Sequence, residues 1–227
     1  SMLRDNLGKG YDKDVKALDE AIEHAVVLRS REIVEQGHAL GSDEAGIFDQ
    51  LLDLYQNRQP NLNERTADAI NRQAFSTPAP LAYVASRLAG IDRTKTVYEP
   101  TAGNGMLLIE ANPRLTWANE IDPARREALA QTFPTVGGFD AAKENGPSMV
   151  DAVIANPPFG KVFDDQRQRV RWRTGKYLTG EIDHAIAIRA LSSMKDDGSA
   201  VLILGSKPEI AEGNRKASAA ETVYADQ

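Results

Sequence analysis

The sequence contains no cysteine, and its three histidines lie far apart at His24, His38 and His184. The absence of cysteine excludes disulfide bonds, cysteine-based zinc sites and thiol nucleophiles. The scattered histidines argue against a metal site built from imidazoles. No apolar run approaches the roughly 20 residues that a membrane-spanning helix needs. We therefore expect a soluble, cytoplasmic protein with no metal ion and no membrane partner.

Acidic residues are in modest excess, which gives a net charge of −6. This sum argues against a nucleic-acid partner until the distribution of charge is considered. Residues 1–75 contain 9 Lys and Arg against 14 Asp and Glu, whereas residues 161–176 contain six basic and two acidic side chains. The acidic excess therefore lies mainly in the first part of the chain, and the basic segment keeps a nucleic-acid partner open.

With 227 residues, 41% of them hydrophobic, the chain can bury a core and has room for one domain and an appendage. Apolar residues recur at spacings of three and four over residues 15–34, which predicts an amphipathic helix. A second helix is expected from Ser42-Asp43-Glu44 to residue 55, and a third over 63–75. Residues 1–75 are thus predicted to be a helical N-terminal extension, a cap or partner-binding element and not a catalytic one.

From residue 76 to residue 227 the pattern changes to short apolar strands that alternate with helices. Strands are expected over 96–99, 115–119, 135–139, 150–155 and 199–204, and helices over 77–88, from 105, over 123–132 and over 181–195. This alternation predicts an α/β domain with a mostly parallel, doubly wound sheet. No strand follows in the polar stretch 207–227, so we expect a sheet that is incomplete after its fifth strand.

The first motif that suits a ligand is Tyr98-Glu-Pro-Thr-Ala-Gly-Asn-Gly105, at a predicted strand-to-helix turn. Glycines there allow the backbone to approach a ligand at the carboxyl edge of a parallel sheet. The motif lacks the third glycine of a dinucleotide fingerprint and the Gly-Lys-Ser/Thr of a phosphate loop. Glu99 suits a cationic or hydroxyl-rich group better than a pyrophosphate, although a plain tight turn explains the motif equally well.

A second motif, Asn119-Glu-Ile-Asp-Pro123, lies at the end of the next predicted strand. In a doubly wound sheet, a carboxylate at the end of the next strand, here some 20 residues after Glu99, binds ribose hydroxyls, which indicates Glu120. Alternatively, Asp122 ahead of Pro123 caps the following helix. Both interpretations can hold because they use different residues.

The third motif, Asn156-Pro-Pro-Phe-Gly160, follows the predicted strand 150–155. The two prolines remove two backbone donors, so the turn presents mainly acceptors in a stiff geometry. Asn156 adds a side-chain carbonyl and Phe159 adds a flat apolar face. This set suits a planar nitrogen heterocycle that bears an amino group. A structural proline turn beside a buried phenylalanine is the weaker alternative.

With these motifs in this order, the sequence resembles the S-adenosylmethionine-dependent DNA adenine-N6 methyltransferases over about residues 75–206. The matching segments are Phe75-Ser-Thr-Pro78, 99–105, 119–122, Phe139-Asp140 and 156–159. Cofactor motifs that precede the catalytic motif are similar to the gamma-type order. Residues 73–90 also resemble the methylase portion of large phage and plasmid methylase–helicase antirestriction proteins. The resemblance implies a Rossmann-like class I methyltransferase fold, S-adenosylmethionine as cofactor and DNA as partner.

The resemblance also implies roles for individual residues. The cofactor contacts would come from Thr77, Glu99, Pro100, Gly103, Gly105, Glu120, Ile121 and Asp140. Among these, Thr77 and Glu99 would meet the methionine end and Glu120 the ribose. Ile121 would pack on the cofactor adenine, whose amino group would donate to Asp140.

The catalytic motif implied by the resemblance is Asn156, Pro157, Pro158 and Phe159. Asn156 and the Pro157 carbonyl would hold the target N6 amino group, while Phe159 would stack on the flipped base. The absence of cysteine disfavours cytosine-C5 methylation, which needs covalent attack.

The basic segment follows the catalytic motif directly, with aromatic residues interleaved. Its candidate DNA contacts are Lys161, Arg167, Arg169, Arg171, Arg173 and Lys176. Such side chains would contact phosphates and contribute affinity without sequence choice. A solvated basic surface loop is the alternative interpretation.

Three further alternatives stay open. The Asn-Pro-Pro-aromatic motif also serves enzymes that methylate glutamine amides in proteins or guanine N2 in RNA. The domain could instead be a non-catalytic cofactor-binding module of a larger protein. The family's later helix, strand pair and target-recognition region do not fit into the last 20 residues, which suggests further domains in a longer parent polypeptide.

Overall fold

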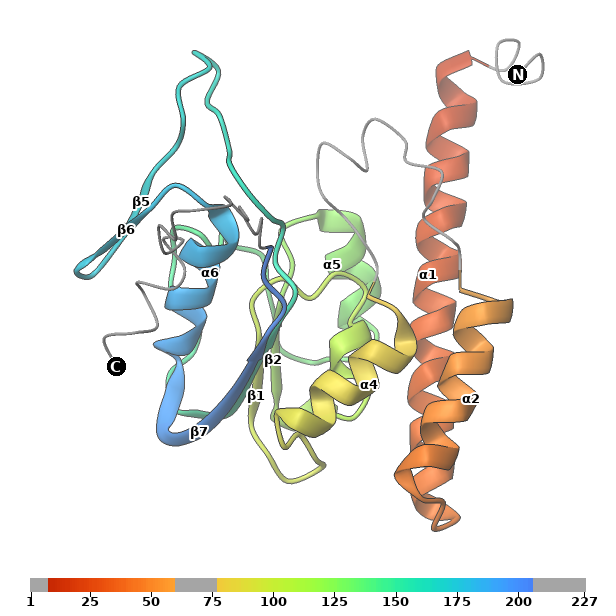
Figure 1. The fold of residues 1–227 in the computed structure, drawn as a ribbon. Coiled ribbons are helices and arrows are strands. Elements are labelled where there is room, and N and C mark those ends of the chain that lie inside the picture. The colour runs from red at the N-terminus through yellow and green to blue at the C-terminus, as the bar shows by residue number, and fades with distance from the viewer. Residues whose placement is uncertain (1–7, 60–76, 206–227) are drawn as a thin grey trace, which may run out of the picture.

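The computed structural model describes residues 8–59 and 77–205 of the chain (Figure 1). The helix expected over 63–75 and the polar stretch 207–227 lie outside the described residues. Within the described ranges, no helix combines the length and the apolar character that a membrane crossing requires.

Two helices, α1 (Gly8–Ala39) and α2 (Glu44–Asn57), form the first part of the chain, as the periodicity predicts. The N-cap of α2 is Asp43 and not Ser42, because the Asp43 carboxylate accepts from the Gly46 N–H at 2.8 Å. The two helices approach closely at Gly37, where a Cβ would lie 2.5 Å from the Ile47 side chain.

The sheet has five strands in the order β3-β2-β1-β4-β7, and every neighbouring pair is parallel. The strands are β1 (Val97–Glu99), β2 (Thr116–Asn119), β3 (Val136–Gly137), β4 (Val150–Ala155) and β7 (Met194–Leu202). The chain builds outward from β1 on one side and then returns to add β4 and β7 on the other. This is the order of a doubly wound, Rossmann-like sheet, and it confirms the fold expected of a class I methyltransferase.

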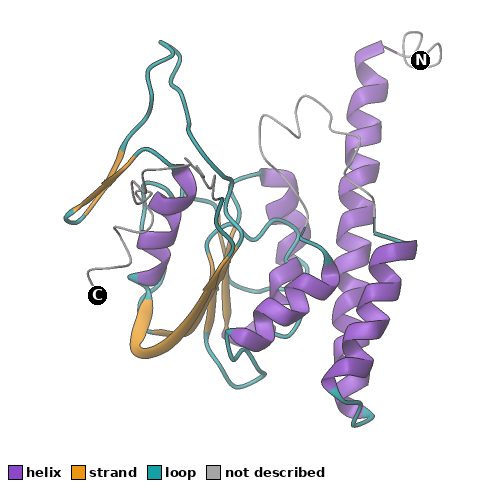
Figure 2. Cartoon of the chain, viewed as in Figure 1, coloured by secondary structure: helices purple, strands orange, loops and turns teal. Residues whose placement is uncertain are grey.

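Helices cover both faces of the sheet (Figure 2). Helices α4 (Ala79–Leu88) and α5 (Pro123–Ala130) lie on one face, and α6 (Ile182–Leu191) lies on the other. Short 3-10 turns occur at Met106–Leu108 and Pro113–Leu115. Successive side chains of a strand point to opposite faces of the sheet, so both faces need cover. The neighbouring residues Val97 and Tyr98, for example, join separate clusters of buried side chains.

The N-terminal helices share a hydrophobic core with the sheet. Val34 of α1 and Leu51 of α2 are fully buried, and they belong to the same cluster as Val97 and Ile154 of the sheet. On the opposite face, Tyr98 packs in a cluster with Ala190 of α6. Helices α1 and α2 therefore pack as a further layer over α4 (Figure 1).

A hairpin in the basic segment is absent from the sequence-based prediction. Strands β5 (Trp172–Thr174) and β6 (Tyr177–Thr179) pair antiparallel across a two-residue turn that begins with Gly175 at φ +57°. Buried Trp172 anchors the hairpin against Ile186 of α6. We call residues 161–180 the projecting arm: the loop between β4 and β5 extends beyond the carboxyl edge of the sheet, and the hairpin lies beside α6 (Figure 1).

The boundary between α6 and β7 also differs from prediction. The helix ends at Leu191, and the strand begins at Met194, five residues earlier than expected. Met194 pairs with Val150, and the Lys195 ammonium lies 2.6 Å from the Asp151 carboxylate. The Lys-Asp-Asp-Gly stretch falls at a shift in register, since pairing with β4 resumes at Ser199, opposite Ala152.

Candidate active site

The carboxyl ends of β1, β2 and β4 bring the three sequence motifs to one edge of the sheet. The segments that follow these strands are 100–105, 120–122 and 156–160. Because parallel strands all end at the same edge, residues that are distant in sequence converge there. Thr77, at the start of α4, joins them through a hydrogen bond to Asn156.

The glycine turn after β1 needs glycine for two different reasons. Gly103 and Gly105 have φ values of +56° and +90°, which side chains other than glycine rarely adopt. A Cβ on Gly105 would lie 2.9 Å from Leu129 on α5, so this glycine also permits close contact with that helix. A Cβ on Gly103 would meet no described atom within 4 Å, so its surface is open to a ligand.

Three buried oxygens in this turn have no hydrogen-bond partner among the described residues: Glu99 Oε2, Thr101 Oγ1 and Asn104 Oδ1. Orphaned polar atoms are uncommon in native proteins and call for a ligand or a water molecule. Burial raises the pKa of Glu99 well above its usual value, and the nearby charge of Glu120 raises it further. A ligand with several N–H donors and a positive charge would satisfy this cluster.

The second motif divides its work between two carboxylates. Asp122 caps α5 by accepting from the backbone N–H groups of Ala124 and Arg125. Glu120 is buried and accepts from the Gly103 N–H and the Asp122 N–H, both at 2.8 Å. The helix cap is therefore present beside a separate carboxylate that contacts the glycine turn. Contact between Glu120 and a ribose stays a prediction.

Helix α1 also holds the glycine turn, which the sequence analysis did not anticipate. Glu20 and Glu23 both accept from the Asn104 side-chain amide, at 3.1 and 3.2 Å. Glu20 further accepts from Arg125 on α5, with contacts between 2.7 and 3.0 Å. The three-residue spacing of the glutamates does place them on one face of a helix, but it does not identify their partners.

Asn119, the last residue of β2, is a second unanticipated site residue. Its buried side chain donates to the carbonyls of Pro100 and Phe139, at 2.9 and 3.0 Å, and accepts from the Phe139 N–H at 3.1 Å. One amide thereby joins the turn after β1 to the segment that precedes Asp140.

The residues expected around the cofactor adenine lie at the same edge. Ile121 is 61% exposed, which is unusual for isoleucine and leaves its face open for stacking. Asp140 accepts from the Ala142 N–H at 3.0 Å, and its second oxygen lies 2.9 Å from the Lys143 ammonium. This contact raises the pKa of Lys143.

The catalytic motif begins directly after β4. The Asn156 amide nitrogen donates to the Thr77 hydroxyl at 3.0 Å, so the Asn156 side-chain oxygen stays available as an acceptor. Pro157 is buried, while Pro158 and Phe159 are half-buried.

Asp183, buried at the start of α6, supports the catalytic motif from the other side. Its carboxylate accepts from the Gly160 N–H at 3.4 Å and from the Gly205 N–H at 3.1 Å. Gly205 lies against Phe159, since a Cβ there would approach that side chain to 2.9 Å. Asp183 therefore fixes the backbone on both sides of Phe159.

All six basic residues expected to contact DNA are exposed on the projecting arm. Arg169 is held by Glu181, with 2.7 Å between its guanidinium and the carboxylate. The Lys176 ammonium lies 5.2 Å from the centre of the Tyr177 ring. Arg167 has a φ of +59°, a strained value for a side chain other than glycine.

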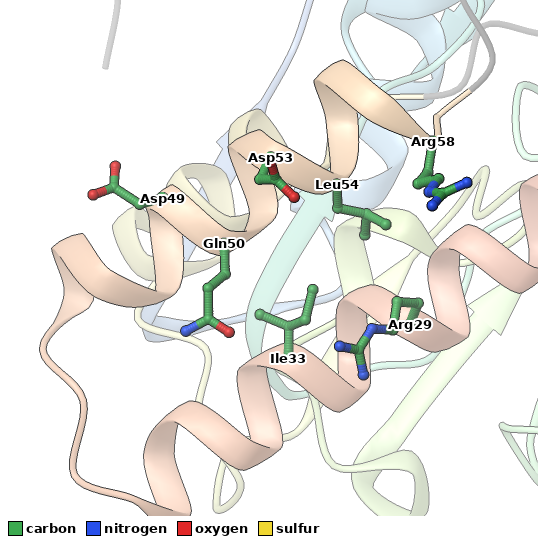
Figure 3. Close-up of a pocket in the computed structure, with 7 residues that line it drawn as sticks. All are labelled: Arg29, Ile33, Asp49, Gln50, Asp53, Leu54 and Arg58. Atoms are coloured by element: carbon green, nitrogen blue, oxygen red, sulfur yellow. The ribbon is translucent and has the colours of Figure 1, made fainter.

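A pocket of about 470 Å³ lies elsewhere, between α1 and α2 (Figure 3). It is lined by Arg29, Ile33, Asp49, Gln50, Asp53, Leu54 and Arg58. None of the sequence-predicted site residues lines it, and its mixed charges indicate no particular ligand.

Across residues 8–59 and 77–205, no three His, Asp or Glu side chains gather closely enough to hold a metal ion.

No protein-family model matches the chain, and no curated protein is similar to it in sequence. The solved structures that resemble parts of it include the following three. PH1948 from Pyrococcus horikoshii, provisionally described as an RNA methyltransferase, is 25% identical over 52% of this chain and 55% of its own, with a TM-score of 0.38. TrmN from Thermus thermophilus is 23% identical over 44% of this chain and 33% of its own, with a TM-score of 0.32. Thermoplasma acidophilum 1320 is 22% identical over 55% of this chain and 62% of its own, with a TM-score of 0.36.

The chain thus spans between one third and about three fifths of the length of these structures. The assignment of the fold rests on the observed strand order and not on these partial similarities.

Proposed function

We propose that the chain is an S-adenosylmethionine-dependent methyltransferase that acts on the N6 amino group of adenine in DNA. The observation that carries the proposal is the position of Asn156 after β4, hydrogen-bonded to Thr77 at the edge where the glycine turn also lies. This arrangement supports a role for Asn156 as an amide acceptor beside the proposed cofactor site.

The glycine turn fits the methionine end of the cofactor. Its unpartnered oxygens on Glu99, Thr101 and Asn104 would accept the N–H groups of an α-ammonium. Glu120 would bind the ribose hydroxyls, with Ile121 and Asp140 at the adenine. When bound, S-adenosylmethionine supplies a methyl group on a positively charged sulfur, which leaves as a neutral thioether.

The catalytic motif can activate an exocyclic amino nitrogen without a metal or a strong base. The lone pair of this nitrogen is conjugated with the ring, which makes it a poor nucleophile. Acceptance of its two hydrogens by Asn156 Oδ1 and the Pro157 carbonyl favours a pyramidal nitrogen, whose lone pair then forms the new N–C bond. One proton would then pass from the methylated nitrogen to solvent water. Positioning and fixed dipoles therefore supply most of the catalysis.

The projecting arm supports a nucleic-acid substrate. It begins immediately after Gly160, so we expect its exposed cations to lie near the place where a flipped base would stack. The sequence resemblance favours DNA over RNA guanine N2 or a protein glutamine amide, and those two substrates become alternative outcomes of the test.

The test is transfer of labelled methyl from S-adenosylmethionine to unmethylated duplex DNA, with parallel reactions on RNA and on protein. We expect label in N6-methyl-2′-deoxyadenosine after digestion of the DNA to nucleosides. Label only in RNA or in glutamine would replace the proposed substrate. Cofactor binding without transfer to any of the three would favour a non-catalytic module.

The variant Asn156→Ala should lower transfer by about 100-fold or more while cofactor affinity stays close to that of the parent chain. Asn57→Ala is the matched control, because Asn57 is exposed and its side chain bonds to Asp53 of its own helix. Unchanged transfer by Asn156→Ala would contradict the mechanism.

A further inference from the structure

Gln59 lies just after α2 and joins the N-terminal helices to the candidate active site. Its side chain is buried, donates to the Thr77 carbonyl at 3.0 Å and accepts from the Ala79 N–H at 3.0 Å. Its own backbone N–H donates to the Leu54 carbonyl at 3.1 Å, which fixes the residue to the end of α2. Both ends of one amide are thus used to hold the segment that leads into α4.

Thr77 transmits this restraint to the catalytic motif. Its backbone is held by Gln59, while its buried hydroxyl accepts from the Asn156 amide at 3.0 Å. One residue, Thr77, therefore links Gln59 to Asn156 through two hydrogen bonds. A displacement of Thr77 would remove the partner of the Asn156 amide and allow that side chain to rotate away from the amino group it is expected to hold.

We propose that Gln59 is a positioning residue for methyl transfer, which orients Asn156 through Thr77. The inference rests on the proposed function of Asn156 and assigns α2 a part in catalysis that the amphipathic sequence of residues 1–75 does not indicate. Small displacements are costly because the reacting groups must be aligned, and a shift of about 1 Å can lower a rate by about 100-fold.

The test compares Gln59→Ala and Gln59→Glu with Gln50→Ala in the full chain. Gln59→Glu keeps an acceptor for the Ala79 N–H but loses the donor to the Thr77 carbonyl. Gln50 is the control, since it is an exposed glutamine of α2, the helix that Gln59 follows, and it bonds back to Gly46. We expect both Gln59 variants to lower kcat about tenfold or more, with KM for S-adenosylmethionine within about twofold and Gln50→Ala unchanged.

A double-mutant cycle with Thr77→Val separates positioning from general stabilisation. If Gln59 acts through the Thr77 hydroxyl, Gln59→Ala should lower kcat less than about twofold once that hydroxyl is absent. Equal effects of Gln59→Ala in both backgrounds would overturn the proposal. Urea unfolding of each variant shows whether it is folded under the assay conditions.

A measurement that needs no activity completes the test. The side-chain amide signal of Asn156 in a ¹⁵N-correlated NMR spectrum, assigned from its loss in Asn156→Ala, reports on the hydrogen bond to Thr77. In Gln59→Ala this signal should move toward its position in Thr77→Val, while in Gln50→Ala it should stay in place. An unmoved signal in Gln59→Ala overturns the proposal. A moved signal in a chain that transfers no methyl would support the positioning contact and contradict the proposed function instead.

Discussion

Glu99 ends β1 and Glu120 follows the neighbouring parallel strand β2, and the charge of Glu120 adds to burial in raising the pKa of Glu99. In the folded chain Glu99 therefore binds its proton more tightly than in the unfolded chain. The folded state binds more protons between the two pKa values, so the free energy of unfolding should fall as the pH rises from about 4.5 through the folded pKa.

The variant Glu99→Gln should remove this pH dependence, because a neutral amide cannot ionise. We expect a smaller loss of stability with rising pH than in the parent chain, measured by urea unfolding at several pH values. Glu35→Gln is the matched control, since Glu35 is half exposed and paired with Arg93. The same pH slope in Glu99→Gln and in the parent chain would show that Glu99 does not titrate abnormally.

The same carboxyl should lose its proton when a cationic cofactor binds. Binding of S-adenosylhomocysteine, which keeps the α-ammonium, should therefore release a proton at pH values below the folded pKa of Glu99 and tighten as the pH rises toward that pKa. Calorimetric titration in buffers of different ionisation enthalpy measures this release. Glu99→Gln should release fewer protons and bind about tenfold more weakly, in line with the loss of a charged hydrogen bond. Proton release equal to that of the parent chain would exclude Glu99 as its source.

Removal of Glu120 should mainly weaken cofactor binding, whereas removal of Asp122 should mainly lower the stability of the fold. Glu120→Ala should weaken cofactor binding by about 1–3 kcal/mol, because a buried charged acceptor is lost. Asp122→Ala removes the N-cap of α5 and should lower the free energy of unfolding by about 1 kcal/mol, with a smaller effect on cofactor affinity. Calorimetry and urea unfolding on both variants measure the two quantities. The reverse pattern would assign the ligand to Asp122.

Asp183 should matter for transfer more than for cofactor binding. Its carboxylate accepts from the backbone N–H groups of Gly160 and Gly205, which lie next to Phe159. Both hydrogen bonds therefore support the pocket expected for the target base. Asp183→Ala should leave the Gly160 and Gly205 N–H groups without their acceptor and cost about 1 kcal/mol of stability, because both hydrogen bonds are only partly buried. Transfer to DNA should fall at least tenfold, while S-adenosylhomocysteine affinity changes less than threefold. An equal loss of transfer and of S-adenosylhomocysteine affinity would indicate that Asp183 supports the fold as a whole and has no specific role in the base pocket.

The fold and the motifs could be predicted because their signals are local. Apolar runs mark the strands, and Gly103, Gly105 and the Pro157-Pro158 pair mark turns that few other residues could form. The hairpin β5–β6 was missed because charged residues hide its alternation, and Trp172 is buried by a helix that comes later in the chain.

The positioning residues could not be predicted for a related reason. Gln59, Asn119 and Asp183 are ordinary polar residues whose partners lie between 18 and 23 residues away. Their roles depend on how the layers pack, so no local spacing distinguishes them from exposed polar residues.

The arginines of the projecting arm should differ in how much they contribute to phosphate binding. Arg171 and Arg173 are exposed, whereas the Glu181 carboxylate already contacts Arg169. Removing one side chain that binds a phosphate should reduce the slope of log K against log salt by about 1 on duplex DNA. The double variant Arg171→Ala, Arg173→Ala should therefore lower that slope by about 2 and weaken binding regardless of sequence. Arg169→Ala should change the slope less, because Glu181 already neutralises part of the Arg169 charge. Titrations of fluorescent duplexes at several salt concentrations measure these slopes, and an unchanged slope in the double variant would place the DNA elsewhere.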